Sequence, residues 1–138
     1  MSAENVEFIR GLATGAGSLP KEQMLAALPT LVAEACDPEI EFVETPERVD
    51  ARTYTGHEGV VEAWSRWLDQ WDTHSFEVDE IEDHGEQALA VFQEKGRGAG
   101  SGAEVASTLY AVFTFRDGKV LRYEEFYDGT AARSALER

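Results

Sequence analysis

The sequence predicts an α+β fold in which helices pack on one face of a curved antiparallel sheet. Apolar residues recur at helical spacing in the first third of the chain and again around residues 56–71. Residues 76–127 instead read as β-rich runs separated by turn residues. Helices and strands that are segregated in this way are typical of α+β proteins. With 138 residues, the chain is expected to form one domain spanning residues 1–138.

The composition excludes several classes of partner. The chain carries 27 acidic and 12 basic side chains, a net charge of −15. Because nucleic acids and anionic membranes require a basic face, we expect neither as a partner. Cys36 is the single cysteine, so neither an internal disulfide nor a cysteine-based zinc site is expected. The sequence shows no signal-peptide pattern and no long apolar run, which predicts a cytoplasmic protein.

The first elements are two helices, over residues 3–13 and 19–36, and a short strand over residues 39–44. Ser18 can cap the second helix, and Pro20 suits its first turn. Pro29 lies inside the same helix and predicts a kink or a break, because proline lacks the backbone N–H. Residues 45–47 are expected to form a turn or loop.

A third helix is predicted from Thr55 to about Trp71. It begins with the pattern of a capping box, in which Thr55 accepts a backbone N–H and Glu58 reaches back. One apolar stripe follows along this helix. The stripe comprises Val60, Trp64, Trp67, Leu68 and Trp71.

The remaining chain predicts strands over residues 76–83, 87–95, 104–115 and 119–127, and a short helix over residues 128–136. A glycine-rich loop spans residues 96–102, and Asp117-Gly118 is a signal for a two-residue hairpin turn. The two central strands are apolar on both faces, which predicts a sheet that is covered twice. We expect a second copy of the chain to cover the outer face, forming a homodimer. Its contact residues would be Tyr110, Val112, Tyr123 and Tyr127.

Several motifs, in their order and spacing, resemble SnoaL-like proteins of the nuclear transport factor 2-like superfamily. They are Glu4-Asn5-Val6, Asp37-Pro38-Glu39-Ile40-Glu41-Phe42, Tyr54-Thr55-Gly56-His57-Glu58-Gly59-Val60 and Phe115-Arg116-Asp117-Gly118-Lys119-Val120. The resemblance implies a cone-shaped α+β barrel, with a pocket between the helices and the concave sheet, usually in a dimer. The superfamily holds polyketide cyclases, ketosteroid isomerases, dehydratases and epoxide hydrolases, and also members with no known activity, so the fold alone does not define the function.

The hairpin predicts which side chains face this pocket. If Asp117 and Gly118 are its two loop residues, Ala111 lies opposite Glu124, and opposed residues share a face. In the polyketide cyclases the resemblance places an acid/base aspartate at Ala111, so the cyclase reaction is not expected here. This identifies the pocket face, unless a bulge shifts the register and turns that face outward. The face carries Leu109, Ala111, Phe113, Arg122, Glu124 and Phe126.

Glu124 is the candidate catalytic carboxylate of this face, although it could instead pair with Arg122 in a purely structural role. His57 is a second candidate base, or else an exposed residue of the first helical turn. Tyr54, Trp64 and Trp67 are candidate ligand contacts, and packing in the core is their alternative role. No metal is expected, because the histidines lack ligand spacing, and no cofactor, because the glycines at 98–102 precede a strand.

The sequence thus predicts an apolar pocket for a small molecule and favours a ligand-binding module without catalysis. An acid/base enzyme that needs no cofactor (an isomerase, dehydratase, cyclase or hydrolase) is one alternative, and a dimerisation scaffold with a filled cone is another. An open pocket with a buried, perturbed carboxylate would favour the enzyme. An open pocket without one would favour the binding module.

Overall fold

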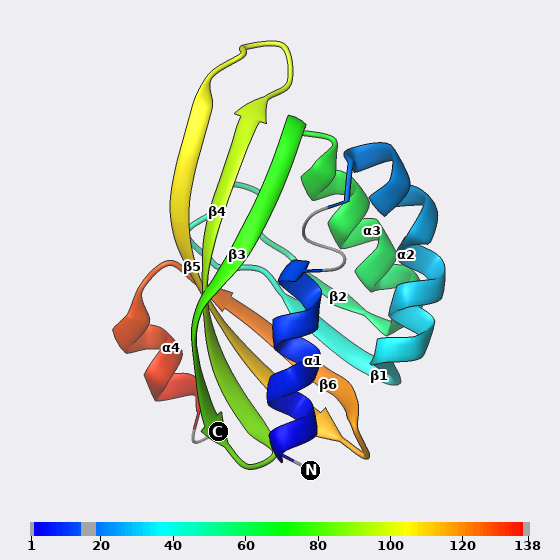
Figure 1. Ribbon diagram of the computed structural model, residues 1–138, viewed down its shortest axis with the longest axis vertical. Coiled ribbons are helices and arrows are strands. Elements are labelled where there is room, and N and C mark those ends of the chain that lie inside the picture. Colours follow the sequence, from blue (N-terminus) through cyan, green and yellow to red (C-terminus); the bar gives the residue numbers. More distant parts are fainter. Residues whose placement is uncertain (1, 15–18, 137–138) are drawn as a thin grey trace.

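The computed structural model describes residues 2–14 and 19–136 (Figure 1). Four helices and six strands follow one another along the chain. They are α1 (Ser2–Thr14), α2 (Lys21–Ala35), β1 (Cys36–Val43), β2 (Thr53–Thr55), α3 (Gly56–Leu68), β3 (Trp71–His84), β4 (Gln87–Gly98), β5 (Glu104–Arg116), β6 (Lys119–Phe126) and α4 (Gly129–Ala135). Among the described residues, no helix is both long and apolar enough to cross a membrane.

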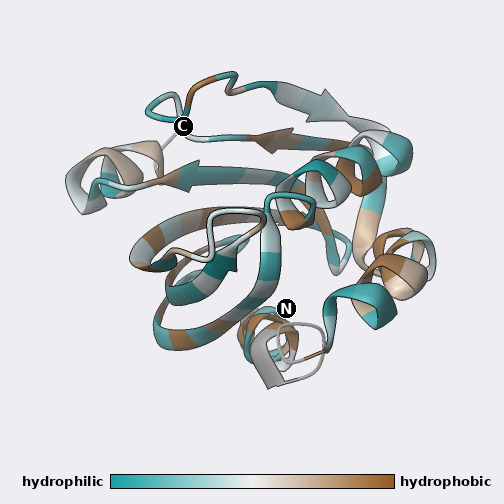
Figure 2. Ribbon diagram, turned by 90° about the horizontal axis from the view of Figure 1, so that it is seen from above, coloured by the Kyte–Doolittle hydropathy of each residue, from teal (hydrophilic) through white to brown (hydrophobic). Residues whose placement is uncertain are grey.

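The strands form one curved, unclosed sheet in the order β2-β1-β6-β5-β4-β3. Neighbouring strands are antiparallel, except that β1 and β6 are parallel. Helices α1, α2 and α3 lie on the concave side, and α4 lies on the other side (Figures 1 and 2). The main core forms between these layers, where Ile9 and Leu28 of the helices join Phe92 and Phe113 of the sheet. The α+β class and the helix-covered curved sheet are therefore confirmed.

The helix boundaries differ from the expectations in three places. The predicted cap Ser18 lies outside the described residues, and α2 begins after Pro20 and continues through Pro29 without a break. Thr55 does occupy the N-cap of α3, but its side chain makes no capping hydrogen bond. The third helix ends at Leu68, so Trp71 belongs to a strand instead.

Trp71 belongs to the sheet because its ring packs against a glycine of the neighbouring strand β4. It pairs with Gly98, and an added Cβ on Gly96 would lie 2.6 Å from the Trp71 ring. Only a residue without a side chain allows the indole to lie this close to the backbone of β4. With this packing, β3 begins at Trp71, five residues before its predicted start. The sequence did not indicate this start, because Trp64, Trp67 and Trp71 follow helical spacing.

The β5–β6 hairpin corrects the predicted register by one residue. Arg116 pairs with Lys119 as expected, but a bulge follows, and Ala111 pairs with Glu125 instead of Glu124. The bulge leaves Leu121 as the extra residue, since Phe115 pairs with Val120 while Thr114 pairs with Arg122. A shift of one residue exchanges the two faces of a strand. The placement of Arg122, Glu124 and Phe126 on the pocket face is therefore wrong.

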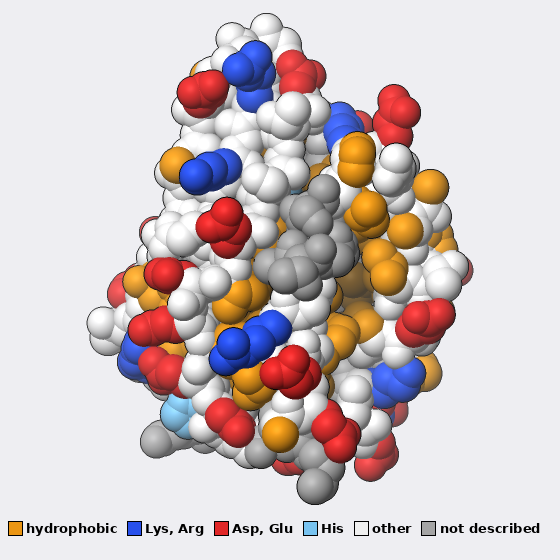
Figure 3. Space-filling model, in the orientation of Figure 1, with side chains coloured by type: hydrophobic (Ala, Val, Ile, Leu, Met, Phe, Trp, Pro, Cys, Tyr) orange, Lys and Arg blue, Asp and Glu red, His pale blue; other side chains and the backbone are white. Residues whose placement is uncertain are grey.

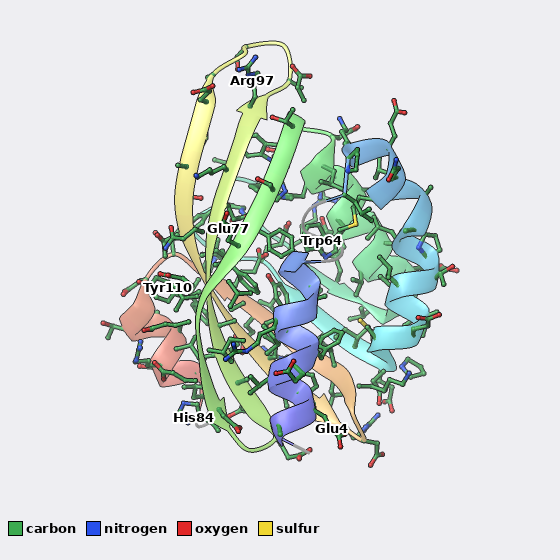
Figure 4. All side chains as sticks on the ribbon, in the orientation of Figure 1. Glu4, Trp64, Glu77, His84, Arg97 and Tyr110 are labelled. Carbon is green, nitrogen blue, oxygen red and sulfur yellow. The ribbon has the colours of Figure 1, made fainter. Side chains whose placement is uncertain are left out.

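Helix α4 of this chain covers part of the outer face of the sheet. Ala132 and Ala135 of α4 pack against Leu89 and Val112 in a second, smaller apolar cluster. The Tyr110 ring lies close to the start of the same helix (Figure 4), where a Cβ added at Gly129 would lie 3.1 Å from it. The expected outer patch is thus wrong in its composition, because Val112 lies beneath α4 and Tyr123 points to the other face. Homodimer formation stays a prediction.

Candidate functional site

A cavity of about 170 Å³ lies between the helices and the concave face of the sheet. Its walls are largely apolar and come from α1, α2, α3 and the strands. Figure 3 shows hydrophobic side chains along the groove between α1 and α2, where Leu12 and Leu31 belong to the lining. The side chains of the described residues leave this cavity unfilled. Aromatic lining residues are Phe8, Phe42, Trp64, Trp67, Phe76, Phe92, Phe113 and Tyr123.

The charged residues of the lining are Glu44, Arg48, Glu94 and Glu125. Glu94 reaches the cavity from β4, where it shares a face with Phe92 two residues before it. Glu125 reaches it from β6, because the bulge at Leu121 turns odd-numbered residues of that strand inward. Arg48 comes from the loop between β1 and β2. Near the start of this loop, Thr45 is wholly buried.

Arg48 is held on three sides. Its Nη1 donates to Glu125 Oε1 at 2.8 Å, and its Nε donates to the Tyr127 hydroxyl at 3.0 Å. Its guanidinium also lies over the Trp67 ring, 4.2 Å from the centroid, in cation–π geometry. Glu44 lies 3.6 Å away on the same loop. These contacts fix a cation from a loop directly beside the inward-facing carboxylate of β6.

Glu125 is a fully enclosed carboxyl group with an altered pKa. Its second oxygen, Oε2, accepts a hydrogen bond from the Tyr123 hydroxyl at 3.0 Å. Burial is the main reason why the pKa of Glu125 rises to about 7, and the charges of Glu94 and Glu44 add to the rise. Arg48 and the Tyr123 hydroxyl act in the opposite direction. The carboxyl group therefore exchanges its proton near neutral pH.

Tyr123 is the hydrogen-bond donor in this arrangement. Burial raises the pKa of its phenol well above the ordinary value, and the charges of Glu125 and Glu94 raise it further. The hydroxyl thus keeps its proton across the physiological range. Cys36 also lines the cavity, and burial raises the pKa of its thiol to about 11, so it is present as the thiol near neutral pH.

A second polar group adjoins the first through Trp67. The Trp67 indole N–H donates to His74 Nε2 at 3.1 Å, and Glu94 Oε2 lies 3.0 Å from the same nitrogen. Nε2 bears either a lone pair or a hydrogen, so it accepts from Trp67 in one tautomer and donates to ionised Glu94 in the other. The other carboxylate oxygen, Glu94 Oε1, is buried and has no hydrogen-bond partner among the described residues. The lining thus contains one carboxylate oxygen whose bonding capacity is unused.

Four of the residues expected to contact a ligand do line the cavity: Trp64, Trp67, Leu109 and Phe113. Trp64 lies between α3 and β3 (Figure 4), with its ring 6.2 Å from that of Phe76. That these residues bind a ligand stays a prediction.

The other expected site residues do not belong to the lining. Ala111 and Tyr54 are buried, and Tyr54 accepts a hydrogen bond from Arg66 through its hydroxyl. His57 Nε2 lies 2.8 Å from the backbone oxygen of Cys36, which joins α3 to β1. Phe126 packs in the apolar cluster beneath α4.

Arg122 and Glu124 form an ion pair, as expected if these two residues have a structural role. Arg122 Nε lies 3.1 Å from Glu124, and its Nη1 lies 2.9 Å from Glu41. The pair is on the face of β6 that points away from the cavity. A catalytic role of Glu124 would therefore have no cavity beside it.

Sequence reasoning missed Arg48, Glu94, Tyr123 and Glu125. Glu94 was within reach, because residues 88, 90, 92 and 94 alternate onto one face of a predicted strand. Arg48 lies in a loop without periodicity, and the bulge that turns Glu125 inward has no sequence signature. Among the described residues, no three His, Cys, Asp or Glu side chains come together as a metal site would require.

A curved, unclosed sheet with helices enclosing a cavity defines a protein of the nuclear transport factor 2-like fold. The family model of the SnoaL-like domain matches residues 25–123, and the chain belongs to this family. No curated protein sequence matches the chain.

Solved structures of low sequence identity share this fold. A proposed SnoaL-like polyketide cyclase from Jannaschia sp. CCS1 superposes with a TM-score of 0.76 at 18% identity, over 98% of this chain and 92% of that one. TerC, co-crystallised with polyporic acid, gives 0.69 at 20% identity over 98% and 99%. A protein of unknown function from Burkholderia pseudomallei K96243 gives 0.68 at 15% identity over 97% and 95%.

Proposed function

We propose that this protein is an acid/base enzyme that moves a proton on a small, largely apolar molecule held in the cavity. The observation that carries the proposal is Glu125, a buried carboxyl group of the cavity lining whose pKa rises to about 7. A general base works best when its pKa lies near the working pH. Perturbed carboxyl groups in apolar cavities also gather at functional sites.

The chemistry that fits these groups is proton transfer at a carbon next to a carbonyl group. Ionised Glu125 takes the proton, and the electron pair of the C–H bond moves into an enolate. Once Glu125 carries the proton, the Tyr123 hydroxyl, which donates to ionised Glu125 in the structure, turns to the enolate oxygen and stabilises it. In a β,γ-unsaturated substrate, return of the proton to the γ-carbon gives an isomerisation, whereas in a β-hydroxy substrate the hydroxyl group takes this proton and leaves as water, which gives a dehydration. Atoms and electrons balance in both without a further reagent.

The family resemblance supports the same carboxylate. The acid/base aspartate of the polyketide cyclases corresponds to Ala111, and the register partner of Ala111 is Glu125. A carboxylate thus stands on the neighbouring strand, opposite the position that the cyclases use. TerC, which shares the fold, was co-crystallised with a small organic molecule, and this agrees with a cavity of similar use.

A ligand-binding module without catalysis is the second candidate. It is favoured by the fact that both oxygens of Glu125 already have partners, Oε1 in Arg48 and Oε2 in Tyr123. In this second candidate, the role of the carboxylate is structural: it holds Arg48 and Tyr123 in place through its two hydrogen bonds.

Deuterium uptake distinguishes the two candidates. We expect the protein to accelerate exchange of the acidic C–H protons of β-tetralone or indanone in D₂O, followed by NMR. Glu125→Gln keeps the shape and removes the titrating group, so it should lower the rate on the order of 10²-fold or more. Glu124→Gln, one residue away on the opposite face, is the matched control and should keep the rate. Equal rates in the wild type and Glu125→Gln would contradict catalysis by Glu125, and binding without any acceleration would favour the module.

We also propose that the protein acts as a homodimer in the cytoplasm. The dimer is supported by the family resemblance and by Tyr110 and Phe126, which remain partly exposed beside α4. Light scattering at tens of micromolar protein tests it, and a mass of one chain at every concentration would contradict it.

A further inference from the structure

The charges around the cavity are unbalanced. The described lining contains three carboxylates, Glu44, Glu94 and Glu125, but one cation, Arg48. With all four groups ionised, the formal charge is −3 + 1 = −2. In a buried setting, such an excess repels an anionic ligand and attracts a cationic one.

Arg48 has little capacity left for an anionic ligand. It donates to Glu125 and Tyr127, lies over Trp67, and has Glu44 beside it. An anion could bind the guanidinium only by replacing these contacts, which would leave buried carboxylates without their partner.

Glu94 shows independently where a donor is missing. The residue is 7% exposed and lines the cavity, and its Oε1 has no hydrogen-bond partner among the described residues. Buried carboxylate oxygens normally accept hydrogen bonds, and the bonds to charged donors are the strongest. An N–H group of a ligand would supply what Glu94 lacks.

We propose that the ligand of this cavity is a hydrophobic amine, bound as its ammonium ion with the charge at Glu94 and the apolar body among the aromatic rings. This inference rests on the proposed function in taking the cavity as the substrate site, and it names the charge class of the substrate. The charge of Glu94 raises the pKa of Glu125, and a bound cation would offset this effect. The cation would thereby favour the ionised, basic form of Glu125.

Three probes that share one ring system and differ in charge test the proposal. They are β-naphthylmethylamine, β-naphthylmethanol and β-naphthoate, and their binding is measured by calorimetry at a pH of ~8, where Glu125 is ionised. We expect the amine to bind at least about tenfold more tightly than the alcohol, since a charge-assisted hydrogen bond contributes this much or more. The naphthoate should bind more weakly than the alcohol.

Glu94→Gln localises the effect. It should weaken the amine about tenfold and change the affinity of the alcohol by no more than about twofold. Glu86→Gln removes an exposed carboxylate at the β3–β4 turn, outside the lining, and should leave all three affinities unchanged. The inference is overturned if the alcohol binds as tightly as the amine, or if Glu94→Gln weakens both equally.

The outcomes separate this inference from the proposed function, because binding is measured without turnover. A preference for the amine that depends on Glu94 supports the inference even if Glu125→Gln leaves deuterium exchange unchanged. Conversely, exchange that depends on Glu125, without a preference for the amine, overturns the inference alone.

Discussion

Replacing Arg48 by methionine removes the only cation of the described cavity lining while keeping much of the side-chain volume. In the wild type, Arg48 Nη1 lies 2.8 Å from Glu125 Oε1 and holds the pKa of that carboxyl group down. Without this charge, burial and the neighbouring carboxylates act unopposed except by Tyr123. We therefore expect the pKa of Glu125 to rise above 7 in Arg48→Met.

The size of the rise follows from the geometry. Two unit charges about 4 Å apart interact by about 4 kcal/mol at an effective dielectric constant of about 20. This corresponds to about three pKa units, and water entering the space left by the guanidinium reduces it, so we expect a rise of about one to three units. Loss of one partner of a buried pair should also lower the free energy of unfolding by about 3 kcal/mol near pH 8.

Carbon-13 NMR of the glutamate carboxyl groups measures this pKa directly. Arg122→Met is the matched control, since it removes an arginine that pairs with Glu124 on the opposite face and should leave the Glu125 titration unchanged. An unchanged or lower pKa of Glu125 in Arg48→Met would refute the reasoning, because it would mean that Arg48 does not control this group.

Three further predictions concern stability and association. Because the pKa of Glu125 is about 7 in the folded protein and about 4.5 for an ordinary glutamate, this group stabilises the fold fully below pH about 4.5, and the contribution is lost as pH rises through about 7. Glu125→Gln leaves Arg48 without its partner at every pH, so the pKa shift is tested by the pH dependence: the stability of the variant relative to the wild type should rise by about 3 kcal/mol from pH ~4 to pH ~8 in urea unfolding, and an equal difference at both would contradict this. Gly96→Ala should lower stability by about 1–3 kcal/mol, because its Cβ would meet the Trp71 ring at 2.6 Å, whereas Gly11→Ala, with nothing within 4 Å, should raise it by up to about 1 kcal/mol. Thermal melts that rank the two variants in the opposite order would refute the packing argument. The net charge of −15 predicts no mobility shift of DNA or RNA at micromolar protein and physiological salt, and a salt-sensitive shift would contradict it.

The fold could be predicted because its signals are local. Helical stripes, strand alternation and the Asp117-Gly118 turn each depend on residues close in sequence, and the structure has the corresponding elements in the expected order. The end of α3 could not be predicted in this way, since Trp71 is placed by the distant Gly96 across the sheet. Tertiary contact outweighed helical spacing at that residue.

The lining could be predicted in part: Trp64, Trp67, Leu109 and Phe113 line the cavity as expected, whereas the charged lining residues were not expected. A carboxylate of β6 does lie opposite Ala111, but the bulge at Leu121 places Glu125 there instead of Glu124. The local sequence does not indicate a bulge at Leu121, because no glycine lies at this position and the strand continues with Val120 and Arg122 on either side. Arg48 was invisible for a different reason: its position depends on a loop whose path is set by tertiary contacts with Tyr127 and Trp67.

The titration of Glu125 in the wild-type protein tests the central claim most directly. Carbon-13 NMR of all glutamate carboxyl groups, between pH about 3 and about 9, should show one group that titrates at about 7. This signal should disappear in Glu125→Gln and remain in Glu124→Gln. The account is contradicted if every glutamate titrates below about 5, or if the neutral-pH signal disappears in Glu124→Gln instead.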